Sequence, residues 1–472
     1  MDTSTKKLLS GSMVYFVGNA LTQLISLLLM RFVTGNITPE EYGFFNLVTT
    51  VSNLAIPFVT LQISDAVFKF VLKAEGEDDK KQYFSICFIV SAISVALIYI
   101  IVFGISFFYN IPHTFLVASY VASHALISIY HKITRSLGKN QVLVVGNLIR
   151  TFIFLLLEIV LISTLDMGVE ALLLAHIISI CLGLIYSEVR VHALKYFNFK
   201  SARFASVIAM LKFSIPLIPN AVFWWLTSSV NSVIVSFRLG MDVNGIYSVS
   251  SKFTSVLSMV TGVLNMSWQD TAIADYGNEG FADFLTKTFN SFVKLIFSAI
   301  VVLIPFVALV LPYMIAPTYY DAIQFAPFLL IAAGISAMSG FMAQIFTGKG
   351  KTQTILITSL FGMIANIALI LLLVDSIGLW AAVLGTLAAD SVLFGIRIFL
   401  TRKEFAKGIA YGHFIILFLM ITISLLLYLK ADIWLNVVWF FVSVIVALVL
   451  NKQFIKDVIS LLFGKFIKRS VK

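Results

Sequence analysis

Long, unbroken apolar runs recur along the whole chain and are separated by short polar segments. A hydrocarbon core of about 30 Å is crossed by roughly 20 helical residues, whereas strands would need an apolar and polar alternation that these runs lack. We therefore predict an all-α polytopic membrane protein with about 14 transmembrane helices. The predicted helices begin near Leu8, Tyr42, Phe84, Thr114, Val142, Val169, Phe213, Ile246, Ser291, Phe325, Thr354, Leu379, His413 and Ile433.

The composition agrees with this assignment and excludes other classes. Hydrophobic residues make up 60% and charged residues 12% of the 472 positions, and the mean hydropathy is +1.00; a soluble domain is about 25% charged. The net charge of +10 does not indicate a nucleic-acid partner, because the basic residues form short clusters between apolar runs. Cys87 and Cys181 lie inside apolar runs, so we expect no disulfide, no metal site and no cofactor.

The placement of the 33 Lys and Arg residues predicts the orientation in the membrane. If Lys6 and Lys7 are cytoplasmic, nearly all the other basic residues also fall in cytoplasmic segments. The exceptions are Arg31, Arg238 and Lys430 on the opposite side and Arg150, Lys252 and Arg397 within predicted helices. We therefore expect both termini to be cytoplasmic, with the basic tail lying as an amphipathic helix on the inner leaflet.

Short sequence echoes indicate an internal duplication. Gly138-Lys139 recurs as Gly348-Lys349, and Tyr42-Gly43 is echoed by Asn244-Gly245. These offsets span six helices, so the two copies would have the same orientation. The predicted organisation is a six-helix lobe over residues 1–190, a basic cytoplasmic linker over 191–212, a second six-helix lobe over 213–400, two further helices over 401–450 and the basic tail over 451–472.

The predicted helix that begins near Phe213 carries Pro216 and Pro219 near its start, and polar residues follow along it. A proline in a spanning helix frees backbone carbonyls, which then need neighbouring helices, hydroxyl groups or water. We therefore expect this helix to face a cavity or a partner helix.

Ionisable residues inside predicted helices are costly in lipid and are the first candidates for function. Candidates for a cationic cavity that binds an anionic headgroup are Arg31, Arg150, Lys252 and Arg397. Glu158 and Asp390 are candidates for carrying a coupling proton or sodium ion. The alternative is that the residues near helix ends snorkel to the membrane surface and that Arg150 forms a structural ion pair.

Uncharged groups in the same helices are candidates for contacts with sugars. Asn220 and Asn231 could form hydrogen bonds with sugar hydroxyls, and Trp224 lies deeper than an interfacial belt, where it could stack on a sugar ring. The alternative for all three is packing or hydrogen bonding between neighbouring helices. His124 and His176 have no metal-ligand companion at a fixed spacing, so we interpret them as structural.

The sequence contains no catalytic or nucleotide-binding motif. It has no glycine-rich phosphate loop, no HExxH and no G-x-S-x-G, which are the usual signatures of such sites. The longest predicted outer loop, Pro312 to Gln324, is too short for the catalytic site of a polysaccharide polymerase or ligase. We therefore predict a transporter and not an enzyme.

Four short segments carry a resemblance to a known family: ITPEEYG at 37–43, SIPLIPN at 214–220, the segment from Gly240 to Ser248, and the segment from Gly378 to Ala381. They resemble the polysaccharide repeat-unit flippases, the O-antigen and exopolysaccharide translocases of the multidrug/oligosaccharidyl-lipid/polysaccharide export superfamily. Many relatives carry an Asp-Arg pair midway along the seventh helix, where this chain has Asn231-Ser232. No headgroup contact is therefore transferred to that helix.

The resemblance implies a two-lobed transporter of the bacterial inner membrane. It would turn an undecaprenyl-diphosphate-linked oligosaccharide from the cytoplasmic to the periplasmic leaflet by alternating access. Its implied partners are this lipid-linked oligosaccharide, membrane lipids, a polysaccharide polymerase and a chain-length regulator.

Three other functions fit the same sequence. A lipid II flippase shares the fold and the number of helices. A multidrug exporter of the superfamily usually has fewer helices and would be favoured by an acidic cavity. A non-transporting scaffold of a polysaccharide assembly complex would tolerate the loss of Arg150, Glu158 and Lys252.

Overall fold

The computed structural model describes residues 27, 29–406, 411–453 and 456. Helices make up nearly all of this described part, and it contains no strand, which confirms the all-α class. The chain divides into two compact units, Met1–Gly245 (unit 1) and Ile246–Lys472 (unit 2). The lobe boundaries expected from the sequence, which fall earlier in the chain, stay a prediction.

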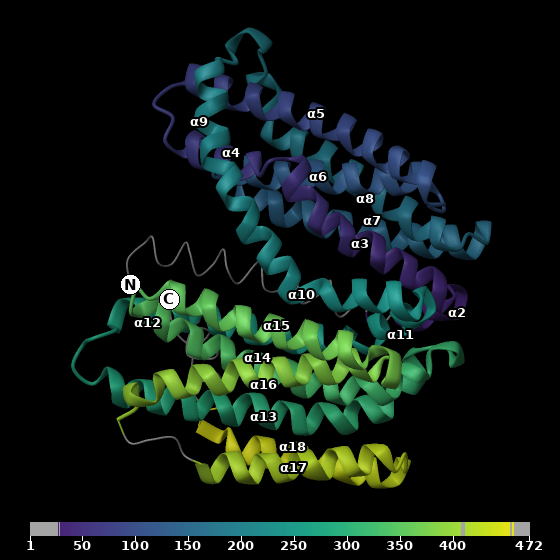
Figure 1. Ribbon diagram of the computed structural model, residues 1–472, viewed down its shortest axis with the longest axis vertical. Helices are drawn as coiled ribbons and strands as arrows, with labels where there is room; N and C mark the ends of the chain where they lie inside the picture. Colours follow the sequence, from purple (N-terminus) through teal and green to yellow (C-terminus); the bar gives the residue numbers. More distant parts are fainter. Residues whose placement is uncertain (1–26, 28, 407–410, 454–455, 457–472) are drawn as a thin grey trace, which may run out of the picture. The chain divides into compact units, whose positions relative to one another are not determined.

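Unit 1 contains the helices from α2 to α10 and the first half of α11 (Figure 1). Their bounds are α2 Met30–Asn36, α3 Pro39–Val59, α4 Ile63–Leu72, α5 Glu77–Phe108, α6 Thr114–Ser136, α7 Asn140–Leu165, α8 Val169–Val191, η1 Ala193–Tyr196, η2 Phe199–Ser201, α9 Phe204–Ser214, η3 Ile215–Leu217, α10 Ile218–Leu239 and α11 Met241–Ser250.

Unit 2 contains the second half of α11 and the helices that follow it (Figure 1). Their bounds are α12 Lys252–Asp275, α13 Phe281–Met314, η4 Pro317–Tyr319, α14 Asp321–Gly348, α15 Thr352–Ile377, α16 Trp380–Thr401, η5 Arg402–Glu404, α17 Tyr411–Leu429 and α18 Ile433–Leu450.

Ten helices in the described part of the chain are long and apolar enough to cross a membrane. Every predicted helix start in that part falls in a helix or next to one. The predicted helices outside the ten are α6, α11 with α12, and α17, together with the one near Leu8. Polar residues such as His124 and His131 lower the hydropathy of α6. Lys252, Asn265 and Gln269 do the same in α12, and the first predicted helix lies outside the described residues.

The start of α3 and its end have clear local causes. Pro39 stands at the first helical position, where its missing N–H costs nothing, and Thr38 and Glu41 form a reciprocal capping box. The helix ends where Leu61 and Gln62 adopt positive φ values of 52° and 51°. The predicted second span is therefore two helices, α3 and α4, joined by a tight turn.

The proline-rich segment after Phe213 also interrupts its helix. The 3₁₀ turn η3, which contains Pro216, separates α9 from α10. α9 packs against α4, whereas α10 packs along α3. The expectation that this segment meets a partner helix is therefore confirmed, and the partner is α3.

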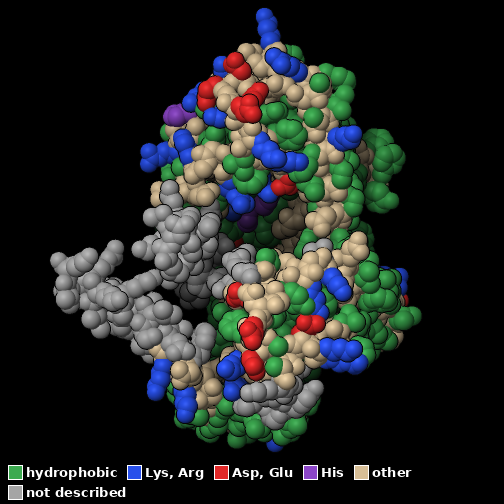
Figure 2. Space-filling view, turned by 90° about the vertical axis from the view of Figure 1, so that its left-hand side faces the viewer, with side chains coloured by type: hydrophobic (Ala, Val, Ile, Leu, Met, Phe, Trp, Pro, Cys, Tyr) green, Lys and Arg blue, Asp and Glu red, His purple; other side chains and the backbone are tan. Residues whose placement is uncertain are grey.

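The basic loops of unit 1 meet at one end of its helices. Lys139, between α6 and α7, donates to the carbonyl of Arg190 at 2.8 Å near the end of α8. The backbone N–H of Asn198 donates to Ser85 Oγ at 2.8 Å in the first turns of α5. Figure 2 looks onto this end, where Lys and Arg side chains gather around a few acidic ones. Such clustering is what the positive-inside rule requires of a cytoplasmic face.

Unit 2 is organised around α14, which packs against α12, α13 and α16. The Trp268 ring of α12 stacks on Phe341 of α14 with ring centroids 4.6 Å apart. At the end of α14, Lys349 forms an ion pair with Glu404, which also accepts a hydrogen bond from Tyr276 at 3.0 Å. The segments that follow α12, α14 and α16 therefore meet at one end of this unit, where the last two supply basic residues. Lys6, Lys7 and almost all of the predicted tail lie outside the described residues.

Candidate functional site

Two glycines bring α3 and α11 into backbone contact inside unit 1. A Cβ on Gly43 would lie 1.7 Å from the carbonyl oxygen of Met241, and a Cβ on Gly245 would lie 2.0 Å from that of Pro39. Pro39 is four residues before Gly43, and Met241 is four residues before Gly245. Each helix thus meets the other in the same way, as expected for a local two-fold relation between repeated segments.

A polar network joins the same helices. Asn244 Nδ2 donates to the Gly43 carbonyl at 2.9 Å, and Ser232 Oγ donates to Asn244 Oδ1 at 2.8 Å. Asn46 Nδ2 reaches Ser232 Oγ at 2.7 Å. One helix of this network, α10, is also bonded to α3 where Trp225 Nε1 donates to the Thr50 carbonyl at 2.7 Å.

Another face of α10, about a quarter turn from the face that contacts α3, carries a stripe of exposed polar and aromatic side chains. Asn220, Trp224, Thr227 and Ser228 recur at helical spacing and are all exposed, and Trp224 keeps 65% of its surface. We call these four residues the α10 stripe. Asn231 lies one turn further along but is buried, with 7% of its surface exposed. The structure therefore groups Asn220 with Trp224 and separates Asn231 from them.

Arg150 lies in a polar layer inside unit 1. Its aliphatic stem packs on α8, where a Cβ on Gly183 would lie 3.6 Å from Arg150 Cβ. Its charge acts on Tyr120, His124 and His131 of α6. Two imidazoles join an aromatic cluster beside it: the His124 ring stacks on Tyr120 with centroids 4.5 Å apart, and the His176 ring lies 4.0 Å from that of Phe154.

Glu158 and Arg31 occupy different environments in unit 1. Glu158 lies two turns beyond Arg150 on α7 and is buried, with 5% of its surface exposed. Arg31 is exposed on the short helix α2. Arg150 and Glu158 therefore share one helix, as predicted, while Arg31 lies on α2, whose Val33 packs in one cluster with Ile162 of α7.

The predicted charges of unit 2 have closely defined surroundings. Lys252 is half-buried at the first position of α12, directly after the break at Ser251. Asp390 lies near Ser336 of α14 and within electrostatic reach of Arg397, seven residues further along α16. The structure thus brings Asp390 and Arg397 together.

Most hydrogen-bond donors of the Arg397 guanidinium are used within unit 2. Its guanidinium donates to Ser339 O and Ser339 Oγ, both at 3.0 Å, to Ser359 Oγ at 2.8 Å, and from Nε to Thr358 Oγ1 at 3.1 Å. Its side chain is 4% exposed. An anionic headgroup would have to displace these bonds, so we leave Arg397 out of the proposed substrate path.

Arg150 and Lys252 belong to different units, so their sharing of one cavity stays a prediction. Sequence reasoning missed Asn46 and Asn244 as the groups that bind α3 to α10 and α11. Asn244 stood next to Gly245 in the recurring glycine segment, which was the available signal. Among the described residues there is no group of three or more side chains able to hold a metal ion.

Comparison with known proteins gives a family and a fold. A family model described as "Polysaccharide biosynthesis protein" matches residues 8–269. Among curated proteins, none matches this sequence. The structure of the lipid II flippase MurJ in an inward closed conformation is similar, with 14% identity and a TM-score of 0.69 over 96% of this chain and 100% of that one.

Two multidrug transporters are also similar. An inward-facing MATE family transporter of the MOP superfamily has 16% identity and a TM-score of 0.61 over 82% of this chain and 98% of that one. The Vibrio cholerae MATE transporter VcmN in its bent form has 16% identity and a TM-score of 0.51 over 86% of this chain and 100% of that one. At these identities the likeness shows the fold.

Proposed function

Because this chain belongs to the polysaccharide biosynthesis protein family, we propose that it is a flippase for lipid-linked oligosaccharide. It moves undecaprenyl-diphosphate-linked repeat units from the cytoplasmic to the periplasmic leaflet of a bacterial inner membrane. Both termini are cytoplasmic in this proposal, and the flipped units pass to a polysaccharide polymerase with its chain-length regulator. The resemblance seen in the sequence and the fold of a lipid II flippase both support it.

The observation that carries the proposal is the α10 stripe. The Thr227 and Ser228 hydroxyls donate to the Trp224 carbonyl of their own helix, so the exposed Asn220 amide and Trp224 indole are the groups of the stripe that favour water or a polar ligand over lipid. An exposed Trp among hydroxyl and amide groups is suited to binding a sugar ring. The apolar face of the sugar would stack on the indole, and the sugar hydroxyls would form hydrogen bonds with the neighbouring polar side chains. This combination favours a glycan over an apolar drug.

Arg150 and Lys252 supply positive charge for the diphosphate. Arg150 is half-buried in α7, where an anionic ligand could meet its guanidinium. Lys252 stands at the break between α11 and α12. Along the chain it is the second cation after the α10 stripe, following Arg238. Glu158 and Asp390 remain the proposed carriers of a coupling ion.

The crossing of α3 with α11 is the proposed closure on the outer side. It lies at the end of α3 away from the basic loops, and it is held by the Asn46, Ser232 and Asn244 network. In alternating access this closure opens once the sugar has entered from the cytoplasmic side.

The test is deletion of the gene followed by analysis of surface polysaccharide and of lipid-linked intermediates by leaflet. We expect intact repeat units to accumulate on the cytoplasmic face, and wild-type protein to restore their export. Restoration by Arg150→Ala and Lys252→Ala proteins, inserted at the wild-type level, would argue for a scaffold instead. Normal polysaccharide with altered drug tolerance would contradict the proposal and favour a multidrug exporter.

A lipid II flippase is the second candidate. The fold likeness to the MurJ structure covers more of this chain than the likeness to either multidrug transporter, which favours a lipid-linked substrate of some kind. The two candidates differ in one result: rescue of cell-wall synthesis in cells depleted of their own lipid II flippase is expected for this candidate alone.

A further inference from the structure

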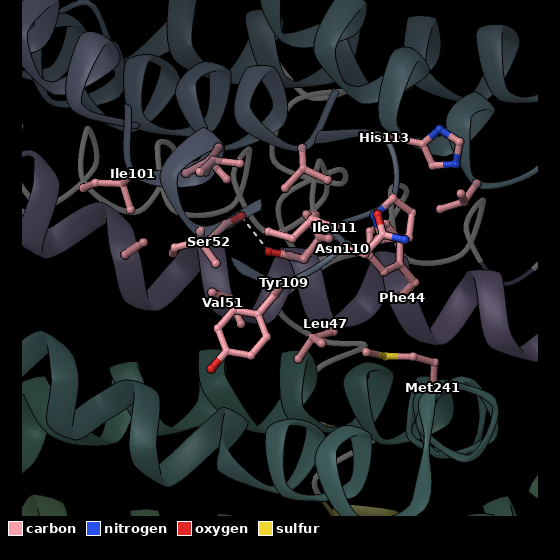
Figure 3. Close-up of a pocket in the computed structure, with 18 of the residues that line it drawn as sticks. Phe44, Leu47, Val51, Ser52, Ile101, Tyr109, Asn110, Ile111, His113 and Met241 are labelled. Atoms are coloured by element: carbon pink, nitrogen blue, oxygen red, sulfur yellow. Dashed lines mark hydrogen bonds between the residues drawn. The ribbon is translucent and has the colours of Figure 1, made fainter. Parts of the chain in front are cut away.

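Unit 1 holds a long apolar pocket that the proposed transport path does not use. Its volume is about 920 Å³, and its walls are α3 and α5, with α6 between them. Leu47 and Val51 of α3 lie across from Ile101 and Ile105 of α5, and Val117 of α6 forms part of the floor. Figure 3 shows Ile101 at one end of this pocket and Asn110 and His113 at the other. We call it the α3–α5 groove.

The length of the groove matches one leaflet of a bilayer. The wall on α5 runs from Ile98 to Tyr109, or about 17 Å at 1.5 Å per residue. The wall on α3 runs further, from Glu40 to Val59, or about 28 Å. The two walls can therefore face each other only over the shorter length of about 17 Å, which is roughly half of a hydrocarbon core of about 30 Å.

The groove opens onto the surface that a spanning helix presents to lipid. Ile101 and Ile105 are each 46% exposed and line it, while Ile100 and Phe107 lie outside it on the same helix and are 66% and 86% exposed. The apolar lining is thus continuous with the apolar outer face of α5. A chain from the bilayer can enter sideways without crossing a polar barrier.

The charged groups of the groove gather at its end near the start of α3, while Ser52, midway along α3, donates its hydroxyl to the carbonyl of Val48. Glu40 is exposed at the charged end. Glu41 accepts hydrogen bonds from the backbone N–H of Thr38 at 2.9 Å and of Val169 at 3.3 Å. The third carboxylate, Glu170, lies 3.4 Å from His113 Nε2. Three carboxylates thus face one imidazole, a balance that disfavours a diphosphate and favours a cationic group.

We propose that the α3–α5 groove binds one bilayer phospholipid with a primary ammonium in its headgroup. One acyl chain lies between α3 and α5, and the ammonium lies against Glu40, whose carboxylate is open at the mouth. The polyprenyl diphosphate of the flipped substrate is excluded by the same charges. This site is separate from the four residues of the α10 stripe, and Met241 lines it beside the crossing of α3 with α11.

The experiment uses full-length protein in nanodiscs that contain a trace of photoactivatable lipid. The probes are a phosphatidylethanolamine and a phosphatidylglycerol that carry the same diazirine on the acyl chain, and labelled peptides are identified by mass spectrometry. We expect the ethanolamine probe to label the facing walls of α3 and α5. Labelling by the glycerol probe should be about tenfold weaker there, because its headgroup has no ammonium to pair with Glu40; tenfold corresponds to about 1.4 kcal/mol.

Two variants and one matched control separate the groove from the rest of α5. Ile101→Trp fills the groove and Glu40→Lys reverses the charge at its mouth, so each should reduce ethanolamine labelling about tenfold. Ile100→Trp places the same bulk one residue away, outside the lining, and should leave labelling unchanged. All three substitutions are at exposed positions, so a folded protein is expected in each case.

Several results would overturn the proposal. Equal labelling by the two probes would show that the headgroup is not recognised. Labelling that persists in Ile101→Trp would place the lipid elsewhere. Competition by a polyprenyl diphosphate would assign the groove to the transported substrate, and competition by a single-chain quaternary amine at equal potency would assign it to lipophilic cations. Protection of the groove by residues 1–26, revealed by cross-linking from Ile101→Cys, would assign it to the chain itself.

Discussion

Asn244 Nδ2 donates a hydrogen bond to the carbonyl of Gly43 at 2.9 Å, across 201 residues of sequence. The bond lies where Gly43 and Gly245 allow the backbones of α3 and α11 to touch. In the proposed function this hydrogen bond holds the outer closure, so its loss should lower stability and impair transport.

Replacing Gly43 by Ala is expected to lower the unfolding temperature of the protein and to abolish export. The added Cβ would lie 1.7 Å from the Met241 carbonyl oxygen, so the helices must separate and the Asn244 bond must break. The measurement is a thermal unfolding curve in detergent together with the polysaccharide assay. Gly104→Ala in α5 is the matched control, because nothing lies within 4 Å of its added Cβ; it should stabilise by about 0.5–1 kcal/mol. Equal behaviour of the two variants would contradict the close crossing.

Arg150→Ala is expected to trap repeat units on the cytoplasmic face, while Arg150→Lys retains part of the export. The lysine keeps the positive charge but not the forked geometry, so partial activity identifies charge as the property that counts. Leaflet-resolved analysis of lipid-linked intermediates reads the result. Lys200→Ala, at an exposed position in η2, serves as the control. Full export by Arg150→Ala would remove this residue from the substrate path.

Arg397→Leu is expected to destabilise unit 2 and not to act first on transport. The change leaves Ser339, Thr358 and Ser359 without their buried donor and the nearby Asp390 without its cation. Each unsatisfied buried group costs about 1–3 kcal/mol, so a drop in unfolding temperature of many degrees should follow. Arg402→Leu, whose guanidinium lies over the exposed ring of Phe399, is the control. An unchanged unfolding temperature with lost export would return Arg397 to the list of substrate contacts.

Trp224→Ala is expected to slow export at least several-fold without changing stability, because an exposed side chain supports little packing but loses a stacking surface worth about 1 kcal/mol. Trp434→Ala is a suitable control, since Trp434 is 79% exposed at the start of α18. Initial rates of repeat-unit appearance on the outer face give the comparison. If both variants export at the wild-type rate, the α10 stripe is not a sugar site.

The helices and their order could be predicted from the sequence because each apolar run is its own signal. Interruptions within helices were harder to predict. Pro216 was a sequence signal for the break between α9 and α10. The turn at Leu61 and Gln62 has no such signal, because neither residue type strongly prefers a positive φ. Tertiary packing, and not local preference, decides such a turn.

The candidate site was predicted only in part, for a related reason. Ionisable residues in spans are visible in a sequence, but their partners are not. In the sequence, Arg397 and Arg150 look alike as isolated cations. In the structure, the Arg397 guanidinium donates hydrogen bonds to α14 and α15, whereas the stem of Arg150 packs on Gly183 near His124. The α3–α5 groove could not be predicted from the sequence, because most of its lining residues are the apolar types that occur on any lipid-facing helix.

The close approach at Gly43 and Gly245 also limits how this protein can be repaired genetically. A larger side chain at either glycine would collide with main-chain carbonyl oxygen, which no substitution on the facing helix can remove. Second-site suppressors should therefore not arise among the direct neighbours of these glycines. They should map to distant positions that let a whole helix shift, and a collection of such suppressors would trace the hinges of the molecule.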